Sequence, residues 1–330
     1  MAERKPMLTA AGLVDYMKAK GVRFNIISEE QARRQQRENN NYFKLTSFSD
    51  NYSRCTSGPN AGKFERLEYA YLQELLQIDL EVRHLLLDMA LDVEHSLKMA
   101  LIAAVEERMV VGKEDGYQII RDFLLDVGNP SLVNQLEAID RRAGNLAKKI
   151  RQNRKNPYCD VLIETYCDEM PIWAYVELVT FGELQELAEY YQLHTGWKPP
   201  VDLRSVDRVR QIRNACAHGN CVINDLRPAV KQANTSAAPK HITDFLSAAG
   251  IKADMRAKKL SNPRINQIVH TLYAYDKLVK DPHMCRLRMN ALRELMEERI
   301  PQKRRYFEDN ALLVSSYEFF SRLVRAMRNG

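Results

Sequence analysis

The longest pattern in the chain is a run of apolar residues spaced three and four apart between Leu67 and Met109. Leu, Met, Ala, Glu and Lys recur in this run, and it holds neither glycine nor proline. Residues three and four apart share one face of an α-helix, and these residue types favour helices. The pattern therefore predicts one very long helix, or two helices separated by a small bend.

Two further runs predict helices with defined ends. The run from Pro171 to Tyr191 starts with a proline, which suits the first helical position, and Gly182 predicts a break within it. The run that ends in "RNACAH" starts after Asp202, a suitable N-cap, and is followed by Gly219, which can close a helix. The C-terminal part of the chain adds two or three helices.

Strand signals are thin. The stretch Val22–Ile27 could form a short extended piece, and turn-forming residues predict loops at Ser49–Lys63 and Ala229–His241. Nothing in the pattern supports a sheet of ordinary size. The sequence therefore predicts an all-α fold.

The length of 330 residues gives a prior of about two domains. We expect an N-terminal helical segment with an aromatic stretch over residues 1–62 and a helical domain over residues 63–330. Within the second domain we expect a basic helical insertion at about residues 129–157 and a basic C-terminal helical part.

Composition narrows the class of protein. With 45% hydrophobic and 28% charged residues, the chain is typical of soluble globular proteins. No apolar run reaches the roughly 18 residues of a membrane span, and the N-terminus lacks the apolar core of a secretory signal, so we expect a cytoplasmic protein. The six cysteines form no CxxC pair, which favours reduced thiols over a disulfide scaffold or a zinc ribbon.

The net charge of +6 is unevenly distributed. The segment "RRAGNLAKKIRQNRKN", residues 141–156, contains no acid, and the part from residue 250 onward is also rich in Lys and Arg. Uncompensated cations attract a phosphate backbone, although a solvated helix face would show the same pattern. The candidate RNA contacts in this segment are Arg141, Arg142, Lys148, Lys149, Arg151, Arg154 and Lys155.

The stretch "QIRNACAHGN", residues 211–220, holds the candidate catalytic residues. An Arg followed five positions later by a His is expected about 0.6 times by chance, and an Asn directly after the Arg lowers that to about 0.04. Arg213 lies at the edge of the apolar stripe of the predicted helix, where a cation requires a partner or an anionic ligand. Asn214 and His218 are one turn apart, so we expect the Asn214 amide to orient the imidazole.

His218 falls in the last helical turn, where exposed carbonyl groups favour the imidazolium. Such a histidine can exchange a proton with a ribose hydroxyl or a leaving oxygen, while Arg213 binds the phosphate charge that grows in the transition state. RNA supplies both groups, and attack by its own 2'-hydroxyl requires no metal. Two other interpretations remain open. His218 could cap the helix beside a structural ion pair, or Cys216, His218 and Cys221 could bind a metal, although their spacing matches no usual zinc motif.

Several segments together resemble a known family. "RNACAHGN" resembles the Arg-Asn-x-x-x-His signature of HEPN-type ribonucleases, in the form carried by bacterial Abi-like abortive-infection proteins of the AbiD and AbiF type. "YAYLQELLQIDLEVRHLLLDMALDVEHSLKMAL" and "PIWAYVELVTFGELQELAEYY" resemble the leading helices and the Pro-x-Trp and Phe-Gly segment of that family, and "YFKLTSF" resembles its N-terminal aromatic stretch. These segments occur in the expected order between about Leu8 and Asn224.

The resemblance implies an all-α HEPN helical bundle and a metal-independent endoribonuclease, without a cofactor, that acts in phage defence or a related toxin system. It also implies a homodimer in which the signatures of two copies line one cleft. In this sequence Arg213 would contact the scissile phosphate, Asn214 would order the site and His218 would act as acid or base. The chain departs from the family after the histidine, where "GNCVIND" stands in place of another His or Asn and an Arg.

Four more residues are candidates for the lining of this cleft: Glu94, Lys98, Arg210 and Asn220. Glu94 and Lys98 form the acidic-then-basic step of the resemblance, although residues four apart also form ordinary surface ion pairs. Arg83, three turns before Glu94, could extend the same polar strip. Arg210 lies one turn before Asn214 on the same stripe.

A different class of function remains open. The same cleft could hold a structured non-coding RNA, with cleavage absent or suppressed, and the protein could be the toxin of a toxin and antitoxin pair. A DNA-binding regulator is less consistent with the sequence because no helix-turn-helix spacing stands out.

Overall fold

Helices dominate the chain wherever the structure describes it, which is over residues 7–39, 42–125, 132–229 and 238–328. In this computed structural model, the described residues form no strand and only two isolated β-bridges, so the all-α prediction is confirmed. Residues 129–131, where the basic insertion is expected to begin, lie outside the described ranges. No helix in the described part of the chain is long and apolar enough to cross a membrane.

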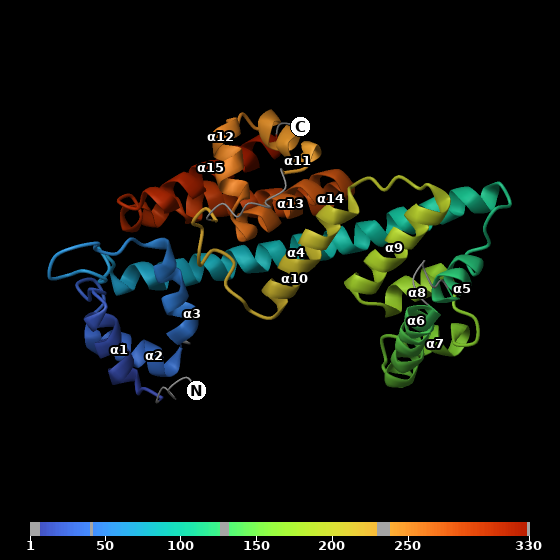
Figure 1. Cartoon of the computed structure of the whole chain (residues 1–330), viewed down its shortest axis with the longest axis horizontal. Helices are drawn as coiled ribbons and strands as arrows, with labels where there is room; N and C mark the ends of the chain where they lie inside the picture. The colour runs from blue at the N-terminus through green and yellow to red at the C-terminus, as the bar shows by residue number, and fades with distance from the viewer. Residues whose placement is uncertain (1–6, 40–41, 126–131, 230–237, 329–330) are drawn as a thin grey trace. The chain divides into compact units, whose positions relative to one another are not determined.

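Figure 1 shows the helices in chain order. They are α1 (Ala10–Ala19), α2 (Glu29–Glu38), α3 (Tyr42–Ser47), η1 (Phe48–Asn51), α4 (Tyr69–Val110), α5 (Gln118–Leu125), α6 (Leu132–Asn153), α7 (Asp160–Tyr166), α8 (Ile172–Leu178), α9 (Phe181–Thr195), α10 (Leu203–Ala217), α11 (Lys240–Ala248), α12 (Ala253–Leu260), α13 (Pro263–Leu278), α14 (Pro282–Arg293), η2 (Glu294–Arg299), η3 (Pro301–Tyr306) and α15 (Ala311–Arg328).

Helix α4 is a single helix of 42 residues, which confirms the first of the two interpretations of its sequence. It contains no residue that breaks a helix, so its hydrogen bonds continue without interruption. Leu72, Met89, Leu97 and Leu101 on this helix are fully buried. Burying a side chain of this size contributes roughly 1.5–3 kcal/mol to folding, so α4 is a principal source of core contacts.

The chain folds into two compact units. Unit 1 comprises residues 1–90, 211–276 and 281–330, and unit 2 comprises residues 91–210 and 277–280. Helices α4 and α10 each contribute residues to both units. Residues 62 and 63 both lie in unit 1, and the expected division of the chain at that point stays a prediction.

The N-terminal helices belong to unit 1 because the stretch after α1 is tied to the start of α4. The N–H of Arg23 donates to the carbonyl of Leu67 at 2.8 Å, and the N–H of Tyr69 donates to the carbonyl of Arg23 at 2.9 Å. The ring of Phe24 stacks on that of Tyr69, with 5.4 Å between the centroids. The extended piece expected at Val22–Ile27 thus forms a single parallel bridge, between Arg23 and Glu68.

The C-terminal part of unit 1 contains five α-helices, α11 to α15, where the sequence predicts two or three. Within this unit they gather beside the first part of α4 (Figure 1). Arg288 pairs with Asp88 at 2.9 Å, and Arg299 pairs with Glu74 at 2.6 Å and with Glu81 at 2.8 Å. These ion pairs connect the C-terminal helices to α4.

In unit 2 the break between α8 and α9 lies before Gly182, so the prediction of a break at that glycine is wrong. Thr180 is the N-cap of α9. Its side chain accepts a hydrogen bond from the N–H of Glu183, and the Glu183 carboxylate accepts one from the N–H of Thr180 at 2.8 Å. This capping box fixes the start of α9 and leaves Gly182 inside its first turn.

Candidate functional site

Helix α10 places the candidate catalytic residues at its C-terminal end. Asp202 is the N-cap of this helix, as expected, because its Oδ1 accepts a hydrogen bond from the N–H of Arg204 at 3.2 Å. The apolar stripe of α10 is buried, as its spacing predicts. Arg213 at the edge of that stripe is half-buried, whereas His218 is exposed.

Gly219 ends the helix in the manner expected from the sequence. Its φ of 68° is left-handed, and its N–H donates to the carbonyl of Cys216 at 2.9 Å, while the N–H of Asn220 donates to the carbonyl of Ala215 at 2.8 Å. This pair of bonds is the Schellman arrangement, which satisfies carbonyls that the helix end leaves without a partner. His218 is thereby the last residue before the chain turns away.

Two cations lie beside this turn. A Cβ atom at Gly219 would be 3.0 Å from Nζ of Lys44 and 3.7 Å from Nη1 of Arg83. The left-handed backbone favours glycine at this position, and a Cβ there would displace the flexible end of Lys44. The two cations are placed at the negative end of the α10 dipole, where positive charge is favoured.

The side chain of Asn214 contacts the arginine, and this differs from the prediction. Its Oδ1 accepts a hydrogen bond from Nη1 of Arg213 at 3.3 Å. Within the described part of the chain, no hydrogen bond joins Asn214 to the imidazole of His218. The long guanidinium side chain can fold back over the next residue, so Asn214 orients Arg213 and leaves the imidazole of His218 facing solvent.

A buried carboxylate holds the loop that follows α10. Asp79 of α4 is fully buried, and its Oδ1 accepts hydrogen bonds from the N–H groups of Val222 at 2.7 Å and Ile223 at 3.0 Å. Its Oδ2 accepts one from Nε of Arg83 at 2.8 Å. Burial raises the pKa of Asp79, against the opposite effect of these three donors. Arg83, which could have extended a polar strip towards Glu94, instead completes this buried ion pair.

Asn51 holds the same loop from a second side. Its Nδ2 donates to the carbonyl of Ile223 at 2.9 Å, and its Oδ1 accepts from the N–H of Leu226 at 2.9 Å. Asn51 is almost fully buried. Together with Asp79 it fixes the backbone just after the candidate motif, while Asn220 stays exposed.

The sequence analysis missed Asp79 and Asn51. Asp79 carried a detectable signal, since it lies four residues after Leu75 and seven before Leu86, both buried, on the apolar face of α4. A carboxylate at such a position requires a buried partner. Asn51 lies in an irregular stretch with no periodic pattern, so nothing in its surroundings marks it.

A comparison with protein families decides the family of this chain. The family model of Abi-like proteins matches residues 37–224, which is more than half of the 330 residues and includes α10, Lys44 and Asp79. The chain belongs to the Abi-like protein family. No curated protein and no solved structure matched the chain. Membership of the Abi-like family suggests a role in abortive infection.

In this Abi-like protein, two of the residues expected to line a cleft, Glu94 and Lys98, lie on the part of α4 that belongs to unit 2. Nζ of Lys98 is 3.5 Å from Oε1 of Glu177 on α8, with which it forms an ion pair. The Lys98 side chain is mostly buried. Within unit 2 this lysine therefore connects α4 to α8.

Arg210 also lies in unit 2, near the boundary at Gln211. Its Nε donates to Oε1 of Gln185 on α9 at 3.2 Å, and its Nη2 donates to Oδ1 of Asp207 at 2.5 Å. These contacts give Arg210 a packing role between α9 and α10 within that unit.

The basic insertion of the Abi-like chain divides into cations with and without acidic partners. Arg141 forms two hydrogen bonds with Glu186 on α9, at 3.1 and 3.2 Å, and Lys149 pairs with Glu183 at 2.9 Å. Arg142 donates to a backbone carbonyl of α5 at 3.0 Å. Three of the seven predicted RNA contacts therefore attach α6 to neighbouring helices. The two acids, Glu183 and Glu186, lie more than thirty residues further along the chain, so the sequence of α6 gives no sign of these ion pairs.

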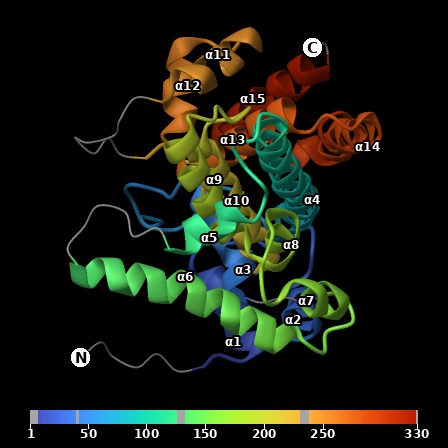
Figure 2. The ribbon, with the colours of Figure 1, turned by 90° about the vertical axis from the view of Figure 1, so that its right-hand side faces the viewer.

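The remaining four predicted RNA contacts are exposed and form no ion pair within the described residues. They are Lys148, Arg151, Arg154 and Lys155. Lys148 and Arg151 lie in the last part of α6, which Figure 2 shows as a straight green helix, and Arg154 and Lys155 follow its last residue, Asn153. Tyr158 follows them and is 92% exposed.

Cysteine and histidine side chains of the Abi-like chain were also candidates for a metal. Among the described residues, no group of three or more His, Cys, Asp or Glu side chains is placed to hold a metal ion. Burial raises the pKa of the Cys216 thiol to about 12.

Proposed function

We propose that this Abi-like protein is a metal-independent endoribonuclease of a bacterial abortive-infection or toxin system. The observation that carries the proposal is the end of α10, where the half-buried Arg213 is oriented by Asn214 and the imidazole of His218 is exposed. Two more cations lie beside Gly219. This motif lies inside the region that the Abi-like family model matches.

The proposed reaction uses only groups of the RNA and of this chain. The 2'-hydroxyl loses its proton and attacks the adjacent phosphorus, the bond to the 5'-oxygen breaks, and that oxygen gains a proton. His218 acts as acid or base in these proton transfers, and Arg213 stabilises the charge on the phosphate oxygens. The products are a 2',3'-cyclic phosphate and a 5'-hydroxyl.

A homodimer is part of the proposal. One histidine cannot easily serve as base and acid at opposite ends of the same cleavage, and the chain has one Arg-Asn-x-x-x-His motif. Two copies of the motif facing one RNA supply two histidines and two arginines. The HEPN fold that the resemblance implies would bring them together in this way.

A second function is favoured by the exposed cations at the end of α6 and just after it. Lys148 and Arg151 on α6 and Lys155 just after it are all exposed, and a group of exposed cations fits a chain of phosphates. We therefore also consider a protein that holds a structured non-coding RNA, with cleavage absent or suppressed. Both functions require RNA binding, and the reaction products distinguish them.

The products of cleavage test the proposed function. Purified protein incubated with end-labelled RNA in EDTA is expected to release fragments with 2',3'-cyclic phosphate and 5'-hydroxyl ends. These ends are identified by their response to polynucleotide kinase, which phosphorylates a free 5'-hydroxyl. Binding without cleavage would favour the second function, and cleavage that requires magnesium or leaves 5'-phosphates would contradict the mechanism.

Replacing Arg151 and Lys155 by glutamine is expected to weaken RNA binding about tenfold at moderate salt. The slope of log K against the logarithm of the salt concentration also becomes about 1.4 less steep, because each phosphate contact with a single strand contributes roughly 0.7. The measurement is a binding titration over a series of salt concentrations. The matched control is Arg141→Gln with Lys149→Gln, which removes equal charge from residues that pair with Glu186 and Glu183. Equal weakening by both double variants would rule out a specific RNA contact surface at the C-terminal end of α6.

A further inference from the structure

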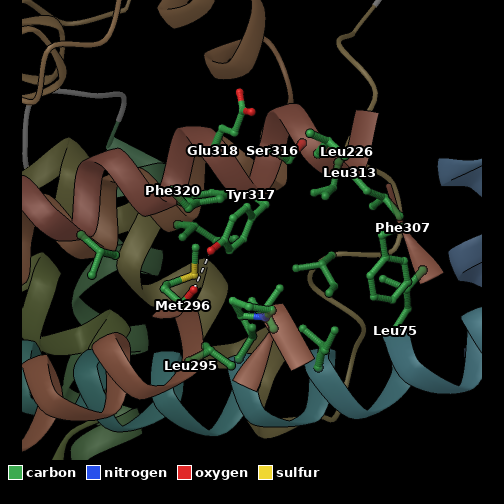
Figure 3. A pocket seen from close by; sticks show the side chains of 18 of the residues that line it. Leu75, Leu226, Leu295, Met296, Phe307, Leu313, Ser316, Tyr317, Glu318 and Phe320 are labelled. Carbon is green, nitrogen blue, oxygen red and sulfur yellow. Dashed lines mark hydrogen bonds between the residues drawn. The ribbon is translucent and has the colours of Figure 1, made fainter. Parts of the chain in front are cut away.

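An apolar cavity of about 440 Å³ lies within unit 1, among helices α4, α13 and α15 and the η2 segment (Figure 3). Its walls are almost entirely hydrocarbon. They include Leu75, Ile78, Leu272, Met296, Leu313 and Phe320. The volume falls in the range of about 300–1,000 Å³ that is usual for small-molecule sites.

One wall of the cavity is an irregular helix. The η2 segment, Glu294–Arg299, is a π-helix, and it presents Leu295 and Met296 to the cavity. The hydroxyl of Tyr317 on α15 donates to the carbonyl of Met296 at 2.8 Å, as the dashed line in Figure 3 shows. Short π-helical turns are uncommon and are frequent at functional sites. This turn shapes the cavity, since it places two consecutive side chains in the wall.

Positive charge predominates where η3 meets the cavity. Arg304 lines it, and its exposed neighbours Lys303 and Arg305 are also basic. Arg304 forms no ion pair within the described residues. Of the two acids near the wall, Glu318 points away from the cavity in Figure 3, which leaves Glu308 against three cations. An occupant with an acidic end is therefore favoured on this side.

We propose that this cavity binds an amphiphilic carboxylate, a single hydrocarbon chain whose acidic end reaches Arg304. The apolar walls favour a chain that leaves water, and each buried CH₂ contributes roughly 0.8 kcal/mol. The guanidinium of Arg304 forms charge-assisted hydrogen bonds with a carboxylate. A neutral chain of equal length gains only the first of these two contributions.

The cavity also touches the loop that follows the candidate motif. Ile223 and Leu226 line it, and their backbone is held by Asp79 and Asn51. A bound chain packs against both side chains and adds to the contacts that fix this loop. Binding is therefore expected to slow hydrogen exchange at the amides of Val222 and Ile223, a readout that does not depend on ribonuclease activity.

Displacement of a fluorescent apolar probe from the full-length protein tests the chemistry of the ligand. Dodecanoate is expected to displace the probe, and dodecanol is expected to do so about tenfold less well. Arg304→Gln removes this difference by weakening dodecanoate alone about tenfold, which corresponds to the loss of one charge-assisted contact. Arg305→Gln, at an exposed neighbour that does not line the cavity, leaves the dodecanol affinity unchanged and weakens dodecanoate far less than Arg304→Gln does. Equal affinity of the wild-type protein for dodecanoate and dodecanol would overturn the proposal that the ligand has an acidic end.

A cavity-filling variant tests the location. Val314→Trp places an indole in the cavity and is expected to abolish probe and dodecanoate binding, whereas Arg322→Trp, on an exposed position of the same helix α15, does not. Exchange at Val222 and Ile223 in the wild-type protein is an independent check if the filled variant does not fold. Unchanged hydrogen exchange at Val222 and Ile223 with saturating dodecanoate would overturn the proposal. A wild-type protein that binds no dodecanoate and forms a dimer that Val314→Trp dissociates would also overturn it, and would assign the cavity to a second copy of the chain.

Discussion

Replacing His218 by alanine is expected to reduce RNA cleavage by about a hundredfold to ten-thousandfold, the usual contribution of a general acid or base. The imidazole is exposed and makes no hydrogen bond within the described residues, so its removal leaves packing unchanged. Binding of RNA and the melting temperature should therefore match those of the wild type. The measurement is a single-turnover cleavage rate in EDTA, with binding followed in parallel.

One control variant and one further variant of the candidate site accompany His218→Ala. His194→Ala removes another exposed histidine, which lies in the last turn of α9 with Nδ1 3.0 Å from the carbonyl of Tyr190, and should leave cleavage unchanged. Arg213→Ala is expected to lower the rate by about a hundredfold to a thousandfold through the loss of charge stabilisation. A His218→Ala protein that cuts RNA as fast as the wild type would show that the catalytic group lies elsewhere.

Replacing Asp79 by alanine is expected to lower the free energy of unfolding by about 3–5 kcal/mol. The change leaves the Arg83 guanidinium buried without its carboxylate, and it removes the acceptor of the Val222 and Ile223 amides. The loop after His218 then loses one of its two anchors. Equilibrium unfolding in urea measures the effect, and cleavage should fall even where the protein remains folded.

The matched control for Asp79 lies on the same helix. Asp88 also pairs with an arginine, Arg288, at 2.9 Å, but half of its side chain is exposed. Asp88→Ala should cost about 0–1 kcal/mol, because solvent screens an exposed pair. The double variant Asp79→Leu with Arg83→Met should be more stable than Asp79→Ala, since it removes both charges together. Equal losses at Asp79 and Asp88 would contradict a special role for the buried carboxylate.

Local patterns in the sequence account for much of the candidate site. The N-cap Asp202, the buried stripe of α10 and the end at Gly219 follow from the periodicity of the helix and from the chemistry of single residues, and all three are confirmed. The position of Arg213 at the edge of the stripe follows from the same geometry. The partner of Asn214 does not, because the side-chain angles of Arg213 decide whether it can reach the amide.

Contacts between distant segments lay beyond the sequence. The run of cations between residues 141 and 155 predicts one basic surface. Glu186 and Glu183 of α9 neutralise Arg141 and Lys149, and only packing brings those acids near. Helix α9 begins after Thr180 because the Thr180 hydroxyl and Glu183 form a capping box. This capping box has more effect on the position of the break than the flexibility of Gly182. Local propensity and capping chemistry compete at such points.

The sequence by itself determined that the chain is helical, where its longest helix runs, and which residues stand at the end of α10. It could do so because helix formation depends on residues within one or two turns of each other. Only the tertiary structure decided that Asp79 and Asn51 hold the loop after His218, that Arg83 serves Asp79, and that the C-terminal helices enclose an apolar cavity. Asp79 and Asn51 each hold a loop more than a hundred positions away, and the pairing of Arg83 with Asp79, four residues apart, matters because packing buries both charges.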